Sequence, residues 1–166
     1  SLYTYWKRAA PPPTLLTFDA PTRETCTIKR PSTSSPLQAL ALWNDVQFVE
    51  AARVLAQRTL REAQPAASSP VGASASVSPT SDADLARIAM LFRRCTGRAP
   101  DASEQAAIAE ALDHWRTRYA EAPEDAVALV AVGEAPRDQE VPPAELAAWT
   151  MLASSMLSLH ATNTRD

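Results

Sequence analysis

Glycine is scarce in this sequence, with only three residues against fourteen prolines. Tight left-handed turns, above all the two-residue turns of β-hairpins, depend on glycine. A chain with so little of it is poorly suited to hairpins, and it cannot form a glycine-rich loop that cradles phosphate groups. We therefore expect helices joined by proline-stiffened loops and no phosphate-binding motif.

Histidine and cysteine are also scarce, with two of each. His114 stands beside the apolar stripe of an expected helix, which is typical of a surface residue, and His160 stands near the C-terminus. Cys26 and Cys95 show no CxxC, CxxCH or zinc-ligand spacing. A disulfide between them is one alternative, and two buried free thiols are the expected state. The sequence thus predicts no histidine-based catalytic group, no metal site and no cofactor in this chain.

An excess of positive charge is absent too, because the net charge is −3 and the isoelectric point is near 5.4. A nucleic-acid-binding protein needs Lys and Arg to displace counterions, so we expect no nucleic-acid partner. No apolar run is long enough to span a membrane. The opening SLYTYWKRAA lacks the order of a signal peptide, so a targeting segment, if the protein is exported, lies outside this sequence.

The charges that are present are unevenly distributed. Residues 1–30 contain five basic and two acidic side chains, a net charge of +3, so the remainder carries −6. This difference fits an N-terminal arm that docks onto an acidic body or faces an anion. We favour the alternative of solvated charges that balance across the fold.

Composition divides the chain into four consecutive segments of one domain. An extended, proline-rich arm is expected over residues 1–35, where LYTYW and TCTIKR favour strands and PPP at 11–13 favours polyproline geometry. A helical segment follows over 36–63. The small, polar, proline-broken residues 64–81 predict a flexible insertion, and a helical bundle is expected over 82–166.

Capping residues mark the ends of the expected helices. Ser35 and Pro36 suit a helix start, and Asn44-Asp45 predicts a break with Asp45 capping the next segment. Beyond the insertion, the expected starts are Ser81, Asp101, about Glu124 and Pro143, and the expected stops are Gly97 and Gly133.

Apolar residues recur at helical spacing, and none of the strong periodicity is two-fold. The expected buried faces are Phe48, Ala52 and Leu55 with Val49, Ala56 and Leu60; Leu85, Ile88, Phe92 and Cys95; Ile108, Leu112, Trp115 and Tyr119; Val127, Leu129, Val130 and Val132; and Leu146, Trp149, Leu152 and Met156, extended by Leu159. We therefore predict a mostly α fold, an irregular helical bundle of five or six helices with an extended N-terminal arm.

The densest group of reactive side chains is TFDAPTRETCTIKR, residues 17–30. Asp19 and Glu24 could act as a carboxylate pair, and Arg23 could hold an anion through two hydrogen bonds. The alternative is a loop that holds itself together, with Asp19 capping the turn before Pro21 and Arg23 paired within the fold. We favour this loop clamp over a catalytic centre.

Three aromatic residues near the start, Tyr3, Tyr5 and Trp6, are candidate ligand-binding residues. Aromatic rings stack on sugars and other flat ligands, so an open platform of this kind would bind carbohydrate. The alternative is that the three rings fill the core.

The order of motifs along the chain resembles one known family. The motifs are SLYTYWKR, PPP, TFDAP-RE-C, PLQAL-L-ND--FVEAAR-LA-R, GR-P and ELAAWTMLASSMLSL. They resemble the planctomycete-specific domain of unknown function at the C-terminus of large exported, cytochrome-c-linked proteins, over nearly all of the chain except 64–81. Departures from the family pattern include PSTSSPLQAL for RTNTPLQAL, Val46 in place of a proline, and LSLHA for LNLDE at the end.

The resemblance implies that this chain is the C-terminal part of that domain. It also implies an exported, periplasmic or cell-envelope location and a haem c module elsewhere in the parent protein. It brings no established reaction.

Three hypotheses on function follow. The first is a non-catalytic helical module that docks onto other domains of the same polypeptide or onto an envelope protein, and it predicts an exposed apolar patch near residues 1–20. The second is part of an envelope enzyme acting on a polymer such as polysaccharide, with Asp19, Arg23 and Glu24 converging in a pocket. The third is a carbohydrate- or anion-binding module that uses the aromatic trio. We favour the first.

Overall fold

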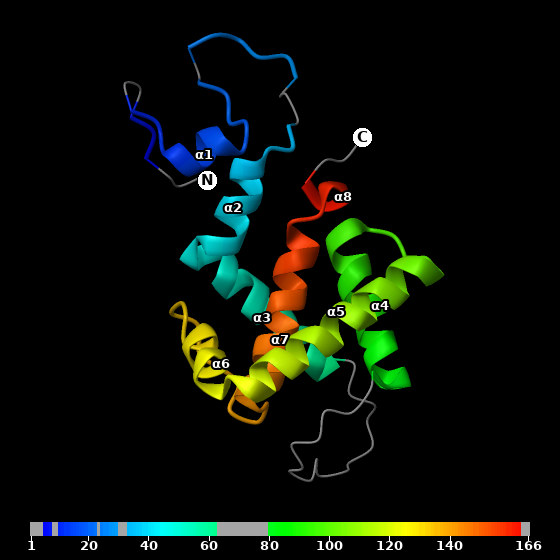
Figure 1. Cartoon of the computed structure of the whole chain (residues 1–166). Helices are drawn as coiled ribbons and strands as arrows, with labels where there is room; N and C mark the ends of the chain where they lie inside the picture. Colours follow the sequence, from blue (N-terminus) through cyan, green and yellow to red (C-terminus); the bar gives the residue numbers. More distant parts are fainter. Residues whose placement is uncertain (1–4, 8–9, 23, 30–32, 63–79, 164–166) are drawn as a thin grey trace.

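The computed structural model describes residues 5–7, 10–22, 24–29, 33–62 and 80–163 of the chain (Figure 1). Within these ranges the protein is helical and contains no strand beyond an isolated bridge between Lys7 and Ala10. The helices are α1 (Pro13–Thr17), α2 (Pro36–Asn44), α3 (Val46–Glu62), α4 (Asp82–Thr96), α5 (Ala102–Glu121), α6 (Pro123–Val130), α7 (Pro143–Leu157) and α8 (His160–Asn163). Six of them have eight residues or more, which confirms the predicted mostly α bundle.

The helices begin where the capping residues predict. Ser35, Ser81 and Asp101 each accept a hydrogen bond from the third backbone N–H of their helix, and the side chain three positions on bonds back to the cap. Each reciprocal pair satisfies two backbone donors that the first turn otherwise leaves unpaired. α4 ends at Gly97, whose φ of 82° is the left-handed conformation that glycine adopts without steric cost.

Helix α7 is the centre of the core. It packs against α3, α5 and α6, and its buried residues extend around most of its circumference. The sequence predicted a single apolar side on this helix, and that prediction is too narrow: the residues buried on α7 besides the predicted four are Ala147, Ala148, Thr150, Ala153 and Ser154. These small side chains let the neighbouring helices approach closely, a contribution that a search for large apolar residues overlooks.

Helix α6 departs from its predicted face. It ends at Val130 rather than near Gly133, and Val127, expected in the core, is 51% exposed. The residues that it buries are Ala126 and Val130. The three valine and leucine positions of this short helix occupy more than one face, so apolar content alone does not identify the buried side.

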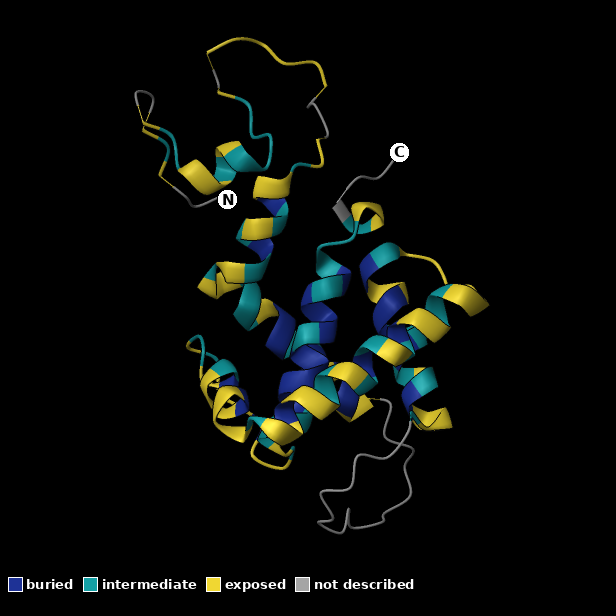
Figure 2. Ribbon diagram, in the orientation of Figure 1, coloured by how far each residue is buried: buried dark blue, intermediate teal, exposed yellow. Residues whose placement is uncertain are grey.

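The described residues 5–7, 10–22, 24–29 and 33–35, here called the arm, lie at one end of α2, away from the bundle (Figure 1). The arm contains α1, which has no buried residue, and Pro13 opens this helix instead of continuing a polyproline segment. No strand forms over the described residues of TCTIKR, 25–29, so that prediction is wrong there. Figure 2 shows the contrast between this exposed arm and the buried centre around α3 and α7.

The arm is attached to the bundle through few contacts. The ring of Phe18 lies 5.5 Å from that of Phe48 on α3, measured between centroids. Most of the insertion predicted over 64–81 lies outside the described residues, which resume at Thr80. Helix α4 begins two residues later, at Asp82.

Candidate functional site

Asp19, the first candidate catalytic residue, holds two parts of the arm together. Its backbone has a φ of 57°, and its carboxylate accepts hydrogen bonds from the backbone N–H of Thr33 at 2.9 Å and from the Thr33 hydroxyl at 2.7 Å. The Thr33 backbone N–H and hydroxyl lower the pKa of Asp19, because both stabilise the ionised carboxylate. This carboxylate therefore bridges fourteen residues of chain rather than capping the turn before Pro21.

Gln38 completes the clamp from inside α2. Its amide nitrogen donates to the carbonyl oxygen of Thr17 at 2.8 Å and to the hydroxyl of Thr33 at 3.1 Å. Gln38 is also the third residue of α2 and bonds back to the cap, Ser35. The glutamine of PLQAL thus fixes the arm to the start of α2, and we call Asp19, Thr33 and Gln38 the arm clamp.

The other candidate residues of the arm do not converge with Asp19. Glu24 is exposed, and no hydrogen bond or ion pair joins it to another described residue. Tyr5 is 81% exposed, whereas Trp6 is half-buried. Arg23 and Tyr3 lie outside the described residues, so their predicted roles stay predictions.

An open depression of about 640 Å³ lies elsewhere, where the α2–α3 junction meets the loop after α6. Its lining residues are Asn44, Asp45, Val46, Gln47, Glu50, Gly133 and Glu134. Glu50 accepts hydrogen bonds from the backbone N–H groups of Glu134 and Ala135, the first at 3.1 Å. Gly133 has a φ of 93°, and a Cβ at this position would lie 2.5 Å from the Glu50 carboxyl carbon. Glu50, one of three acidic residues that line this depression, is thus engaged by the loop itself.

Arg53 also binds the loop after α6. It is only 1% exposed, and its guanidinium donates to the carbonyl oxygen of Ala135 at 2.8 Å and to the side chain of Gln57 at 3.1 Å. A carboxylate oxygen of Glu50 lies 3.9 Å from the same guanidinium. Glu50 and Arg53 of the FVEAAR motif therefore bind N–H groups and a carbonyl oxygen of the same loop. Their role in these contacts is structural.

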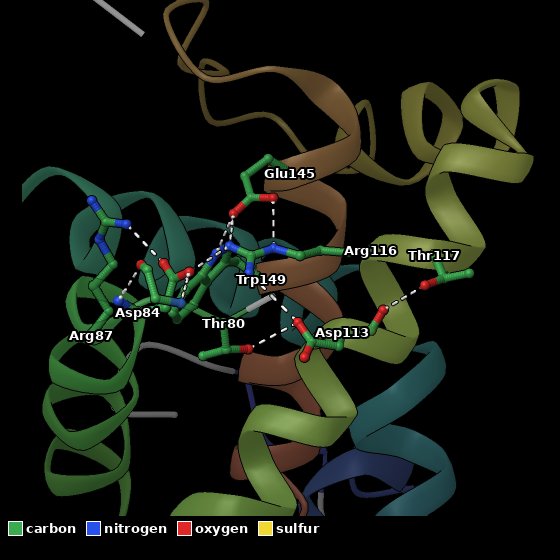
Figure 3. Close-up of polar contacts among 9 residues, drawn as sticks. Thr80, Asp84, Arg87, Asp113, Arg116, Thr117, Glu145 and Trp149 are labelled. Atoms are coloured by element: carbon green, nitrogen blue, oxygen red, sulfur yellow. Dashed lines mark hydrogen bonds and ion pairs between the residues drawn. The ribbon is translucent and has the colours of Figure 1, made fainter. Parts of the chain in front are cut away.

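A second polar cluster joins three helices around Arg116 (Figure 3). From α5, this guanidinium donates to Asp84 on α4 at 3.1 Å and to both carboxylate oxygens of Glu145 on α7, one of them at 3.0 Å. The indole N–H of Trp149 donates to Glu145 at 2.9 Å, and Arg87 donates to Asp84 at 3.0 Å. Sequence reasoning did not find this cluster, because no sequence pattern relates residues about thirty positions apart. The only signals were Asp84 in a capping box and Glu145 in the first turn of its helix.

The electrostatics of this cluster favour permanent ionisation. Burial acts to raise the pKa of Asp84, but the charge of Arg116 and the hydrogen bonds from Ser81, Arg116 and Arg87 outweigh it and lower the pKa. Burial acts to lower the pKa of Arg116, but hydrogen bonding and attraction to Glu145 outweigh it and raise the pKa. A general acid needs a raised carboxyl pKa, which is the opposite of the direction at Asp84. The cluster is therefore suited to joining α4, α5 and α7 rather than to proton transfer.

The histidine and cysteine residues lie apart from both clusters. His114 is exposed, as predicted, and its ring meets the edge of Trp115. Both thiols are free; Cys95 is buried, which raises its pKa, whereas the prediction of burial is wrong for Cys26, which is exposed. In the described part of the chain no three His, Cys, Asp or Glu side chains are grouped to hold a metal ion. No helix there has the length and apolarity to cross a membrane.

Comparison with known proteins gives one match. Residues 1–112 match the family PSD1, described as a protein of unknown function (DUF1553). No curated protein and no solved structure matches the chain. The match ends inside α5, so α7, with ELAAWTMLASSMLSL, lies beyond it although α7 occupies the centre of the core. With two thirds of its length matched, the chain belongs to the PSD1 family of unknown function.

Proposed function

We propose that this chain is a non-catalytic helical module that docks, through α2 and the arm, onto another domain of the same polypeptide. The parent protein is, on this proposal, a larger exported, cytochrome-associated protein whose haem c lies in a different domain. The module supplies a rigid body and an apolar docking surface rather than a reactive group.

The observation that carries this proposal is the exposure of α2. This helix, PLQALALWN, contains no charged residue, yet Leu37 is 59% exposed and Leu40 is 60% exposed. The two leucines are three positions apart and thus share one face. Tyr5 and Leu16 of the arm add further exposed apolar area. A contiguous exposed apolar face on a helix without charged residues is typical of a surface that a partner covers.

The polar residues of the family motifs support the same proposal. Gln38, Asp45, Glu50 and Arg53 each bond to backbone or side-chain groups of this chain. These bonds hold loops and helix ends, which supports a structural role for the four residues. The enzyme hypothesis is weakened most at Asp19, because its carboxylate is occupied by Thr33 and Gln38.

The test compares the accessibility of α2 in this chain and in the longer polypeptide. A Cys26→Ser background removes the exposed native thiol, and Leu40→Cys or Val127→Cys introduces a reporter on α2 or on α6, where the native side chains are 60% and 51% exposed. Docking predicts that a maleimide labels the α2 reporter rapidly in this chain and at least tenfold more slowly in the longer polypeptide. The α6 reporter should react at equal rates in both. Equal rates at Leu40→Cys would refute the proposal.

A further inference from the structure

One segment of the arm has the sequence of a strand and lacks the structure of one. Residues 25–29, TCTIK, alternate polar and apolar side chains, with Cys26 and Ile28 as the apolar members. Alternation of this kind, together with β-branched residues, is typical of a strand that buries one side. The segment forms no strand in this chain, and both Cys26 and Ile28 are exposed, Ile28 completely. The side that the pattern predicts to be buried is therefore uncovered.

The main chain of this segment is also unpaired. No backbone N–H or carbonyl group of residues 24–29 bonds to another described residue. The described part of the chain offers no strand to pair with it, since its β contacts are limited to the isolated bridge between Lys7 and Ala10. A sheet that pairs with this segment therefore has to come from elsewhere.

The arm clamp fixes the chain on both sides of the segment. Asp19 accepts hydrogen bonds from the backbone N–H and the hydroxyl of Thr33, fourteen residues on, and Gln38 donates to the carbonyl oxygen of Thr17 and to the hydroxyl of Thr33. Loops whose ends are held close together are frequent sites of recognition. Fixing the two ends also reduces the conformational entropy that the residues between them lose on binding. The clamp thus anchors an unpaired segment to the start of α2.

We infer that residues 25–29 add as a strand to the exposed edge of a β-sheet in the domain onto which this module docks; this rests on the proposed docking function. Main-chain hydrogen bonds to the edge strand supply affinity, and pockets for alternate side chains supply selectivity. Cys26 and Ile28 are two positions apart, so in a strand they lie on one side and contact the apolar face of the sheet. Thr25 and Thr27 occupy the opposite side.

Residue-resolved amide hydrogen exchange tests this pairing in the longer polypeptide. An added strand has a neighbour on one side only, so alternate N–H groups bond to that neighbour and the others face solvent. We expect alternate amides within 25–29 to exchange slower by about tenfold or more than in this chain, with little change at the amides between them. The amides of α7 are the control and should exchange equally in both.

Proline substitutions test the alternation independently. Thr27→Pro removes one N–H and Ile28→Pro removes the next, which points to the other side of the strand. One of the two should restore the exchange of the remaining amides in 25–29 to the rate in this chain, whereas the other should behave like alanine at its position. Thr27→Ala and Ile28→Ala are the matched controls. The exposure of both residues predicts that all four variants keep the thermal unfolding midpoint of the bundle.

The outcomes separate this inference from the docking proposal. No protection of 25–29, or protection without alternation that both prolines remove equally, overturns strand addition; docking still stands if the Leu40→Cys reporter is protected. Loss of protection at both Leu40→Cys and 25–29 refutes docking and the inference together. Protection of 25–29 in this chain alone that rises with protein concentration assigns the pairing to a second copy and also overturns the inference.

Discussion

The arm and the bundle use polar residues in opposite ways. In the bundle, a partly buried guanidinium at Arg116 joins α4, α5 and α7, and around it the large residues are closely packed. In the arm, the Asp19 carboxylate joins two exposed stretches of chain, with little apolar burial behind it. The bundle is therefore stabilised mainly by its apolar core, and polar contacts add to it. The arm, in contrast, depends on polar contacts for its shape.

Removal of α7 should have the largest effect on the stability of the bundle. A chain that ends at Leu112, where the family match ends, lacks α7 together with α6 and the second half of α5, and it exposes the apolar faces of α3 and of the rest of α5 that α7 covers. We expect it to show no cooperative thermal transition by circular dichroism, because the remaining helices have lost their common core. A chain that ends at Leu159 is the control and should unfold cooperatively. A cooperative transition in the shorter chain would show that the matched residues fold alone.

Arg116→Ala should have the next largest effect. It leaves the carboxylates of Asp84 and Glu145, which are 7% and 31% exposed, without their shared cation. We expect a loss of about 2–4 kcal/mol in the free energy of unfolding by urea, somewhat less than the ~3–5 kcal/mol of a fully buried broken pair, because Glu145 is partly exposed.

The matched control for this substitution is Arg118→Ala, on the same helix. Arg118 and its partner Asp125 are both more than half exposed, and the pair spans 3.4 Å. Exposed pairs of this kind contribute at most about 1 kcal/mol. Equal losses in the two variants would contradict the assignment of Arg116 as the tie between helices.

Acid should weaken the bundle through Asp84. Its pKa in the folded state is lowered from the usual 3.8, so its contribution to stability is complete above that value and is lost as the pH falls through the folded pKa. We expect the unfolding free energy to decrease as the pH is lowered below about 4, with a smaller slope in Asp84→Asn. An unchanged slope in that variant would assign the acid sensitivity to other carboxylates.

Asp19→Ala should have the smallest effect on global stability and a local effect on the arm. Without the carboxylate, the backbone N–H of Thr33 loses its acceptor, so its hydrogen exchange should become faster while the exchange of α7 amides stays unchanged. If the variant instead unfolds globally at a lower urea concentration by an amount similar to Arg116→Ala, the arm is part of the bundle's cooperative unit. Loss of a specific activity of the parent protein, with folding intact, would favour the enzyme hypothesis.

Local sequence signals predicted well where several helices begin. Ser35, Ser81 and Asp101 cap helices as expected, because a cap is satisfied by a backbone group three residues away. The break at Asp45 also follows, since its side chain bonds to the N–H of Gln47 two positions on. The extent of burial was predicted less well, as Val127 and the small residues of α7 show. Burial depends on how many neighbours surround a helix, and those neighbours are distant in the sequence.

The sequence by itself determined that this protein is helical and where most of its longer helices begin. Each of these depends on contacts within a few residues or on composition. Only the tertiary structure decided that Asp19 meets Thr33 and Gln38, that Arg116 joins Asp84 to Glu145, and that α2 leaves its leucines exposed. These pairings depend on which helix faces come together, and a hydrogen bond between distant residues forms only after packing has brought them within reach.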